Sequence, residues 1–246
     1  MSALVSAELL KLRTTRAWIG YLLAGVALTA IAAAATVGTA EDARLGSTEL
    51  SREILSAASF STVLAFVIGI VAVTMEWRHG TVTRTFLGEP RRERVLVAKE
   101  LFILLLGAAL AVLSIALVLA IAIPWLAVDG SSFETGGTVG YALRLVASTM
   151  LWGALGVGVG AVVHSQTPAL VGSILWVLLG ESLVTALLGL VDAEDAGDYL
   201  PGRALSAFDG SEPGGLSMWP AGAVGVAWVV GLALLGALRI AREDVT

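Results

Sequence analysis

The sequence predicts an all-α, polytopic membrane protein with six transmembrane helices and both termini in the cytoplasm. Three observations lead to this prediction. Apolar residues make up 57% of the 246 residues and charged residues only 14%, against about 25% in an ordinary soluble domain. Six apolar runs each come close to the roughly 20 residues that a helix needs to cross the hydrocarbon core. Basic residues gather on one side of these runs, which is the signal that orients membrane helices.

The six apolar runs give the expected boundaries of the spans. They do not alternate apolar with polar residues as the strands of a membrane barrel do, so helices are expected throughout. We expect the spans at Trp18–Gly38, Ala57–Met75, Leu101–Ile123, Leu145–Val163, Ala169–Val191 and Pro220–Leu238. The first run overlaps in pattern with a secretory signal sequence. It is longer than the core of such a signal, which has roughly 7–15 residues, so we expect it to be retained as a span.

The basic residues give the expected orientation. The segment Glu76–Glu100, between the second and third runs, holds six of the fifteen basic residues, and Lys and Arg stay on the cytoplasmic side during insertion. With this segment inside, six spans place both termini inside. The cytoplasmic side then carries eleven Lys and Arg residues, including Lys11, Arg13 and Arg16. The external side carries four, namely Arg44, Arg52, Arg144 and Arg203.

The N-terminal residues 1–17 are expected to form a helix, because Val5, Leu9 and Leu12 lie on one face at helical spacing. This helix either lies on the inner leaflet as an interfacial helix or extends the first span, and the sequence leaves both possibilities open. Together with the six spans, the cytoplasmic loop 76–100 and the external loop 191–219, it forms one membrane domain, 1–246. We expect this domain in the cell membrane.

Glu181 lies near the middle of the fifth run. A carboxylate at that depth is costly in a bilayer and usually faces the bundle or a cavity. One interpretation is a proton, cation or substrate site. The other, which we favour, is a protonated or hydrogen-bonded carboxyl that joins two helices, through Ser182 or Thr185 on its own helix or through a hydroxyl on a neighbour. The first interpretation supports an alternative function, a stand-alone secondary transporter that uses Glu181.

Gly156 and Gly160 lie four residues apart in the fourth run. Small residues at this spacing let two helix backbones approach each other. We expect the two glycines to serve helix packing within one chain rather than a seam between two copies.

Missing residues exclude several enzyme classes. The chain has no Cys, so disulfides and thiol catalysis are excluded. Its two lysines, Lys11 and Lys99, lie outside any GxxxxGK[ST] pattern, so the chain has no P-loop for ATP. His79 and His164 lie at the ends of runs, without the spacing of metal ligands. We therefore expect no catalytic residue, no metal site and no cofactor in this chain, and a basic loop that meets lipid rather than nucleic acid.

The basic segment carries a specific pattern. It reads EWRHGTVTRTFLGEPRRERVLVAKE, and its glycines and proline divide it into a short element, Thr81–Leu87, and a second that begins at Arg91. The chain resembles the permease subunits of type 2 ABC exporters over essentially its full length. The segment fits E-x-x-x-G-T, then P-R-R, then A-K. The N-terminal AELLKLRTTRAWIG and the motif YLP, followed by Ala204 and Leu205, add to the resemblance.

The resemblance implies a transport subunit that is not itself an enzyme. Such a subunit pairs with a second permease half, identical or homologous, and binds a cytoplasmic ABC ATPase that holds ATP and Mg. In these exporters the loop between the second and third spans seats in the ATPase. We therefore expect contacts with the ATPase or with lipid phosphates from this loop, namely from Glu76, Arg78, Gly80, Thr81, Arg84, Phe86, Pro90, Arg91, Arg92, Arg94 and Lys99.

Overall fold

The computed structural model describes residues 2–14, 17–41, 44–211 and 215–242. Helices make up 85% of the structure, and the described residues contain no strand. Six described helices are long and apolar enough to cross a membrane, at Ile19–Gly38, Thr48–Arg78, Arg92–Val128, Val139–Val163, Gln166–Gly189 and Met218–Arg242. The predicted fold class, all-α with six spans, is confirmed. Arg16 and the side chain of Arg13, which entered the count of cytoplasmic charges, lie outside what the structure describes.

Several spans consist of more than one helical element. In chain order the elements are α1 (Ser2–Thr14), α2 (Ala17–Gly38), α3 (Thr48–Ser56), η2 (Ala57–Ser59), α4 (Phe60–Arg78), α5 (Val82–Gly88), α6 (Arg92–Val128), α7 (Val139–Val163), α8 (Gln166–Leu175), η3 (Trp176–Gly180), α9 (Glu181–Gly189), η4 (Glu194–Tyr199), α10 (Pro201–Asp209) and α11 (Met218–Arg242). The second span is α3, η2 and α4 in succession. The fifth span is α8, η3 and α9.

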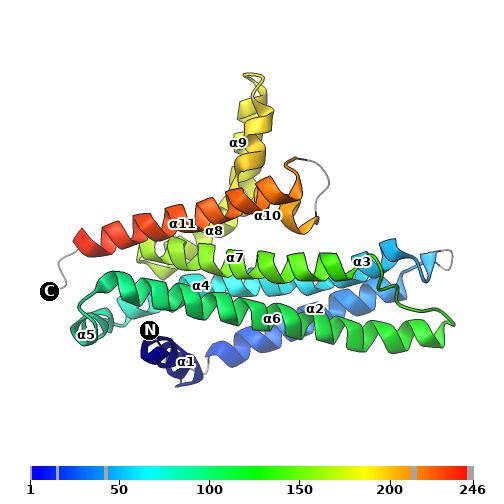
Figure 1. The fold of residues 1–246 in the computed structure, drawn as a ribbon, viewed down its shortest axis with the longest axis horizontal. Coiled ribbons are helices and arrows are strands. Elements are labelled where there is room, and N and C mark those ends of the chain that lie inside the picture. The colour runs from blue at the N-terminus through cyan, green and yellow to red at the C-terminus, as the bar shows by residue number, and fades with distance from the viewer. Residues whose placement is uncertain (1, 15–16, 42–43, 212–214, 243–246) are drawn as a thin grey trace.

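The long helices other than the fifth span run between two ends of the molecule (Figure 1). One end holds α1, α5 and the C-terminal end of α11, and we call it the α5 end. The opposite end holds α3, and we call it the α3 end. In Figure 1, α1 and the C-terminal end of α11 lie at the same end of the molecule.

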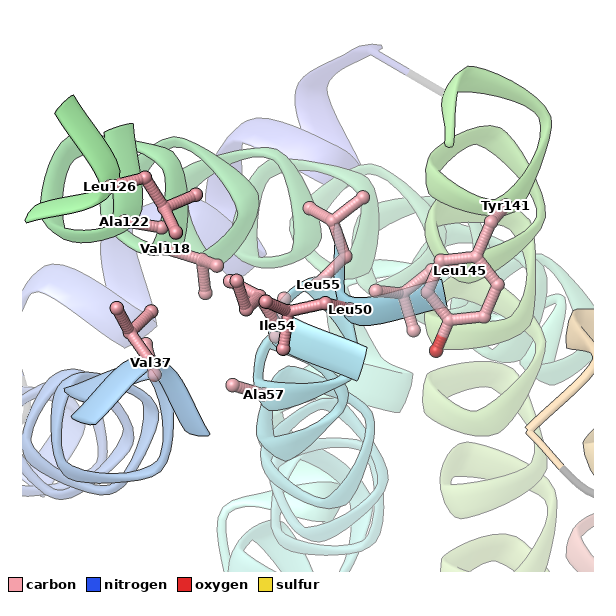
Figure 2. Packing of buried hydrophobic residues seen from close by; sticks show 12 residues of the cluster. Val37, Leu50, Ile54, Leu55, Ala57, Val118, Ala122, Leu126, Tyr141 and Leu145 are labelled. Carbon is pink, nitrogen blue, oxygen red and sulfur yellow. The ribbon is translucent and has the colours of Figure 1, made fainter. Parts of the chain in front are cut away.

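The second span begins nine residues before the predicted start at Ala57. Ser47 starts it by accepting a hydrogen bond from the Leu50 backbone N–H at 3.1 Å, as a helix N-cap does. The first turns of α3 contain several polar residues, but one face of the helix is apolar and packs among α2, α6 and α7. Figure 2 shows Leu50, Ile54 and Leu55 on that face. A hydropathy average over these turns is low, which is why the sequence pattern placed the start too late.

The helices α4 and α7 form the buried centre of the bundle. A Cβ atom on Gly156 of α7 would overlap the Phe66 carbonyl oxygen of α4, and one on Gly160 would lie 2.9 Å from the Ile70 carbonyl oxygen. From the other side, a Cβ on Gly69 of α4 would overlap the Gly153 carbonyl oxygen. The two backbones are therefore in direct contact, and Gly156 and Gly160 lie against a helix of the same chain.

The fifth span differs from the others because it leaves the bundle. In Figure 1, α9 rises away from the other long helices. The fifth span has exposed apolar side chains on all sides, and Leu178, Leu183 and Leu187 are examples. A helix that is apolar all round and has few neighbours within its own chain is suited to contact with lipid or with another membrane chain.

Candidate functional site

A cluster of four charged side chains, three of them buried, lies at the α5 end. Glu8 and Lys11 come from α1, Glu76 from α4 and Lys99 from α6. The Lys99 Nζ atom lies 2.6 Å from Glu76 Oε1, 2.9 Å from Glu8 Oε2 and 3.0 Å from the Ala72 carbonyl oxygen. These acceptors match the three N–H groups of an ammonium. Only 3% of Lys99 is exposed.

Lys11 completes the cluster on its outer side. Its Nζ atom lies 2.6 Å from Glu8 Oε1 and 2.7 Å from Glu76 Oε1. Partial burial lowers the pKa of Lys11, but hydrogen bonds to Glu76 and Glu8 and their charges outweigh this, so the pKa is raised. Two ammonium groups thus face two carboxylates, and a buried charge is tolerated when it is paired and hydrogen-bonded in this way.

The cluster joins three helices, α1, α4 and α6, next to the short helix α5. Glu76 lies two residues before the end of α4, and Lys99 lies near the start of α6, so their ion pair joins the two spans that α5 connects. Glu8 ties α1 to the same point. Glu76 and Lys99, which the sequence predicts to contact a partner, are both buried inside the chain. Glu8 was not predicted as part of a site, although an acid among the basic and apolar residues of α1 was a visible signal.

Two arginines of the basic segment are tied to other helices at the α5 end. Arg78 donates a hydrogen bond to Gln166 Oε1 at 3.0 Å. Arg92 donates to the Ile240 carbonyl oxygen at 2.7 Å, and its guanidinium lies 5.0 Å from the centre of the Phe86 ring. Arg78 and Arg92 therefore connect the two sides of α5 to α8 and α11, and Phe86 packs beneath Arg92.

A further set of residues in the segment points outward. We call it the α5 surface, and it comprises Arg84, Leu87, Pro90, Arg91 and Arg94, all of them exposed. The three arginine side chains make no hydrogen bond or ion pair with any residue that the structure describes. Leu87 is 79% exposed, at the C-terminal end of α5. An exposed large apolar side chain among cationic groups is the composition of a protein–protein contact or of a site at the lipid headgroups.

The turn before α5 explains two other residues of the pattern. Gly80 has a φ of +63°, a left-handed conformation in which a side chain is strained. The Thr81 backbone N–H then donates to the Glu76 carbonyl oxygen at 2.9 Å, which closes the end of α4. Gly80 and Thr81 thus set the direction in which α5 leaves α4.

Glu181 forms a second polar site, where the fifth span meets α10. Its Oε1 atom accepts from the Gly202 backbone N–H at 2.8 Å and its Oε2 atom from the Arg203 backbone N–H at 3.1 Å. These are unpaired N–H groups in the first turn of α10, which begins at Pro201, so Glu181 caps that helix from another part of the chain. The Thr185 hydroxyl donates to the Glu181 carbonyl oxygen, not to its carboxylate. The carboxylate joins two helices, as the favoured interpretation expected, but through backbone donors.

Replacing Glu181 with Ala should destabilise the chain by about 1–2 kcal/mol, because two buried N–H groups of α10 lose their acceptor. Glu181→Gln keeps one acceptor oxygen and should cost less. Thermal unfolding of the purified chain, followed by tryptophan fluorescence, measures both effects. If both variants unfold at the same midpoint temperature as the unaltered chain, the capping role is contradicted.

No family model matches this chain, and no curated protein matches it.

Proposed function

We propose that the chain is the membrane subunit of an ATP-driven transporter, a permease half of the type 2 ABC exporter kind that couples through α5 to a separate ATPase. Six apolar helices are compatible with a membrane transport protein. The observation that carries the finer proposal is the geometry of α5. This short helix lies between two spans that an ion pair joins, and the α5 surface exposes Leu87 and Arg84 of α5 together with Arg91 and Arg94 at the start of α6.

The ion pair gives α5 a mechanical role in this proposal. A helix held at both ends by α4 and α6 cannot move alone, so a force on its surface tilts both spans. The movement continues into α7, because glycines bring the α4 and α7 backbones into contact. A closing ATPase would thus bias a membrane bundle between two arrangements, which is the usual form of a ligand-driven switch. Glu76 and Lys99 transmit the force, and the α5 surface receives it.

The orientation follows from the same assignment. The proposal places the α5 end in the cytoplasm, where an ATPase is available. The excess of Lys and Arg on this side of the spans supports it, because basic residues are retained on the cytoplasmic side. Labelling of a Cys introduced at Arg91 should succeed only from the cytoplasmic side, and labelling from outside would contradict the orientation.

The second permease half has a surface available on the fifth span. Its apolar side chains lie outside the bundle of this chain, and a second membrane subunit, either a copy or a homologue, would cover part of them. In this pairing the transport pathway is lined by both permease halves. The ATP and Mg are held by the ATPase rather than by this chain.

Replacing Leu87 with Arg should weaken assembly with the ATPase about tenfold or more, because the substitution puts a charge at the centre of the proposed contact. Copurification with an ABC ATPase encoded beside this chain measures assembly, and ATP turnover of the complex gives a second readout. Val128→Arg is the matched control, since Val128 is 85% exposed at the opposite end of α6. It should leave assembly intact.

Two results would count against the proposal. One is unchanged assembly and ATP turnover after Leu87→Arg. The other is gradient-driven solute flux in liposomes that contain this chain alone, abolished by Glu181→Gln, which would support the secondary transporter instead.

A further inference from the structure

A cavity of about 290 Å³ lies where the fifth span departs from the bundle. One wall is made by α8 and η3, and the facing walls are made by α4, α7 and α11. Four aromatic side chains from four different elements line it, namely Phe66, Trp152, Trp176 and Trp228. It is separate from the ion cluster at the α5 end, and the proposed coupling role does not use it.

Each of the four aromatic side chains makes a specific contact that fixes its position in the cavity wall. The Trp152 ring meets the Phe66 ring edge-on, with centroids 5.4 Å apart and an angle of 85° between the planes. The Trp228 Nε1–H donates to the Tyr199 carbonyl oxygen at 2.8 Å. The Trp176 ring lies over Gly180, where a Cβ would come within 2.7 Å of it. Walls that are fixed before a ligand arrives reduce the ordering cost of binding.

The π-helical turn η3 places two of the lining residues together. Its hydrogen bond runs from the Glu181 backbone N–H to the Trp176 carbonyl oxygen, five residues apart. This inserts one residue into the fifth span and brings Trp176 and Glu181 onto the wall of the same cavity. Single π turns of this kind occur often at functional sites.

The lining offers a ligand little charge. Among the described residues of the wall, Glu181 is the charged one, and both of its oxygens already accept backbone N–H groups of α10. Ser173 adds one hydroxyl. An anionic group placed here would lose its water without gaining a partner of opposite charge, which is costly, and a cationic group would meet only a carboxylate that is already hydrogen-bonded. The cavity therefore selects for an uncharged, apolar group.

We propose that this cavity binds the hydrocarbon chain of a neutral, single-chain amphiphile that enters from the bilayer. Its volume is at the lower end of the roughly 300–1,000 Å³ found for ligand pockets, which suits one chain and excludes a whole two-chain lipid. The fifth span lies within the apolar set of helices, so hydrocarbon is the medium around it. That the bound chain belongs to the transported substrate rests on the proposed function.

A photoactivatable monoacylglycerol, with the reactive group at the end of its chain, tests the binding. The purified chain is labelled in phosphatidylcholine nanodiscs, and the labelled peptides are mapped by mass spectrometry. Label should appear on α8, η3 and α11 around the cavity, and unlabelled monoacylglycerol should compete it away. Label spread evenly over the exposed faces of the spans would overturn the proposal, as would cross-links that join two copies of the chain through this cavity.

A pair of glycine variants makes the test specific. A Cβ on Gly172, which lines the cavity, would meet no atom within 4 Å, so a side chain can start there without overlap, and Gly172→Phe should occupy part of the cavity and abolish the label. Gly20 on α2 has equally open surroundings, and Gly20→Phe should keep it. Equal labelling of the two variants would overturn the proposal.

Whether the bound amphiphile is a substrate is tested by a separate measurement, the ATP turnover of the assembled complex. Monoacylglycerol should stimulate ATP turnover by the assembled complex in the unaltered chain and in Gly20→Phe, but not in Gly172→Phe. Labelling at the cavity without this stimulation would overturn the substrate assignment and leave the coupling proposal standing. Failure of the coupling proposal is recognised separately, by unchanged assembly in Leu87→Arg.

Discussion

Replacing Lys99 with Met is expected to destabilise the chain by about 3 kcal/mol or more. Lys99 is buried, and its ammonium is the common partner of Glu8, Glu76 and the Ala72 carbonyl oxygen. Without it, Lys11 alone faces two carboxylates that are themselves buried. Because the cluster joins α1, α4 and α6, the loss should loosen the α5 end as a unit. Thermal unfolding in detergent, followed by tryptophan fluorescence, measures the change.

Lys11→Met is the matched control for this prediction. It makes the same chemical change in the same cluster, but the Lys11 side chain is 44% exposed, and ion pairs at exposed positions contribute about 0–1 kcal/mol. Lys99 would still hold both carboxylates after this substitution. Combining Glu76→Gln with Lys99→Met should restore part of the stability, because fewer buried charges are left unpaired. Equal destabilisation by Lys11→Met and Lys99→Met would contradict the difference in burial.

Much of the fold could be predicted from the sequence because the bilayer imposes simple lengths and a simple composition. The six apolar runs correspond to the six long helices, and the division of the basic segment at Gly80 and at Gly88 to Pro90 matches the limits of α5. The prediction was less accurate where a helix has a polar face. The third span was expected to begin at Leu101, whereas helix α6 begins at Arg92, next to the predicted start of the second element at Arg91. The first stretch of α6 is amphipathic and does not raise the average hydropathy.

The candidate site was less accessible to sequence reasoning, because it depends on pairs of residues far apart in the chain. Glu8, Glu76 and Lys99 are brought together by the folding of three helices, and no local pattern indicates that they meet. The same holds for Glu181. A side chain can be recognised as costly at its position, but its partners are backbone N–H groups at Gly202 and Arg203, which every residue type except proline carries.

The residues of the basic segment whose placement could be predicted from sequence were those whose role is local. Gly80 is an example, since a turn between two helices calls for a residue that tolerates a left-handed backbone. The exposed arginines of the α5 surface are another, because a basic segment between two apolar runs has to leave the membrane. Roles that depend on burial, such as that of Lys99, required the three-dimensional arrangement.

The second large effect is expected at the contact between α4 and α7. Gly156→Val should destabilise the chain by about 3 kcal/mol or more, because its Cβ overlaps the Phe66 carbonyl oxygen and a backbone atom cannot rotate away as a side chain can. Gly156→Ala should also destabilise the chain, but by less than Gly156→Val. The unfolding midpoint in detergent is the measurement.

Gly140→Val provides the control on the same helix. A Cβ at Gly140, near the start of α7, would meet no atom within 4 Å, so this variant tests the cost of valine in the helix without the overlap. Its midpoint should stay close to that of the unaltered chain. Because α4 carries one end of α5, the contact at Gly156 is also the proposed route by which a movement of α5 would reach α7. Equal midpoints for Gly156→Val and Gly140→Val would show that the two backbones do not touch, and the proposed transmission through the bundle would lose its physical basis.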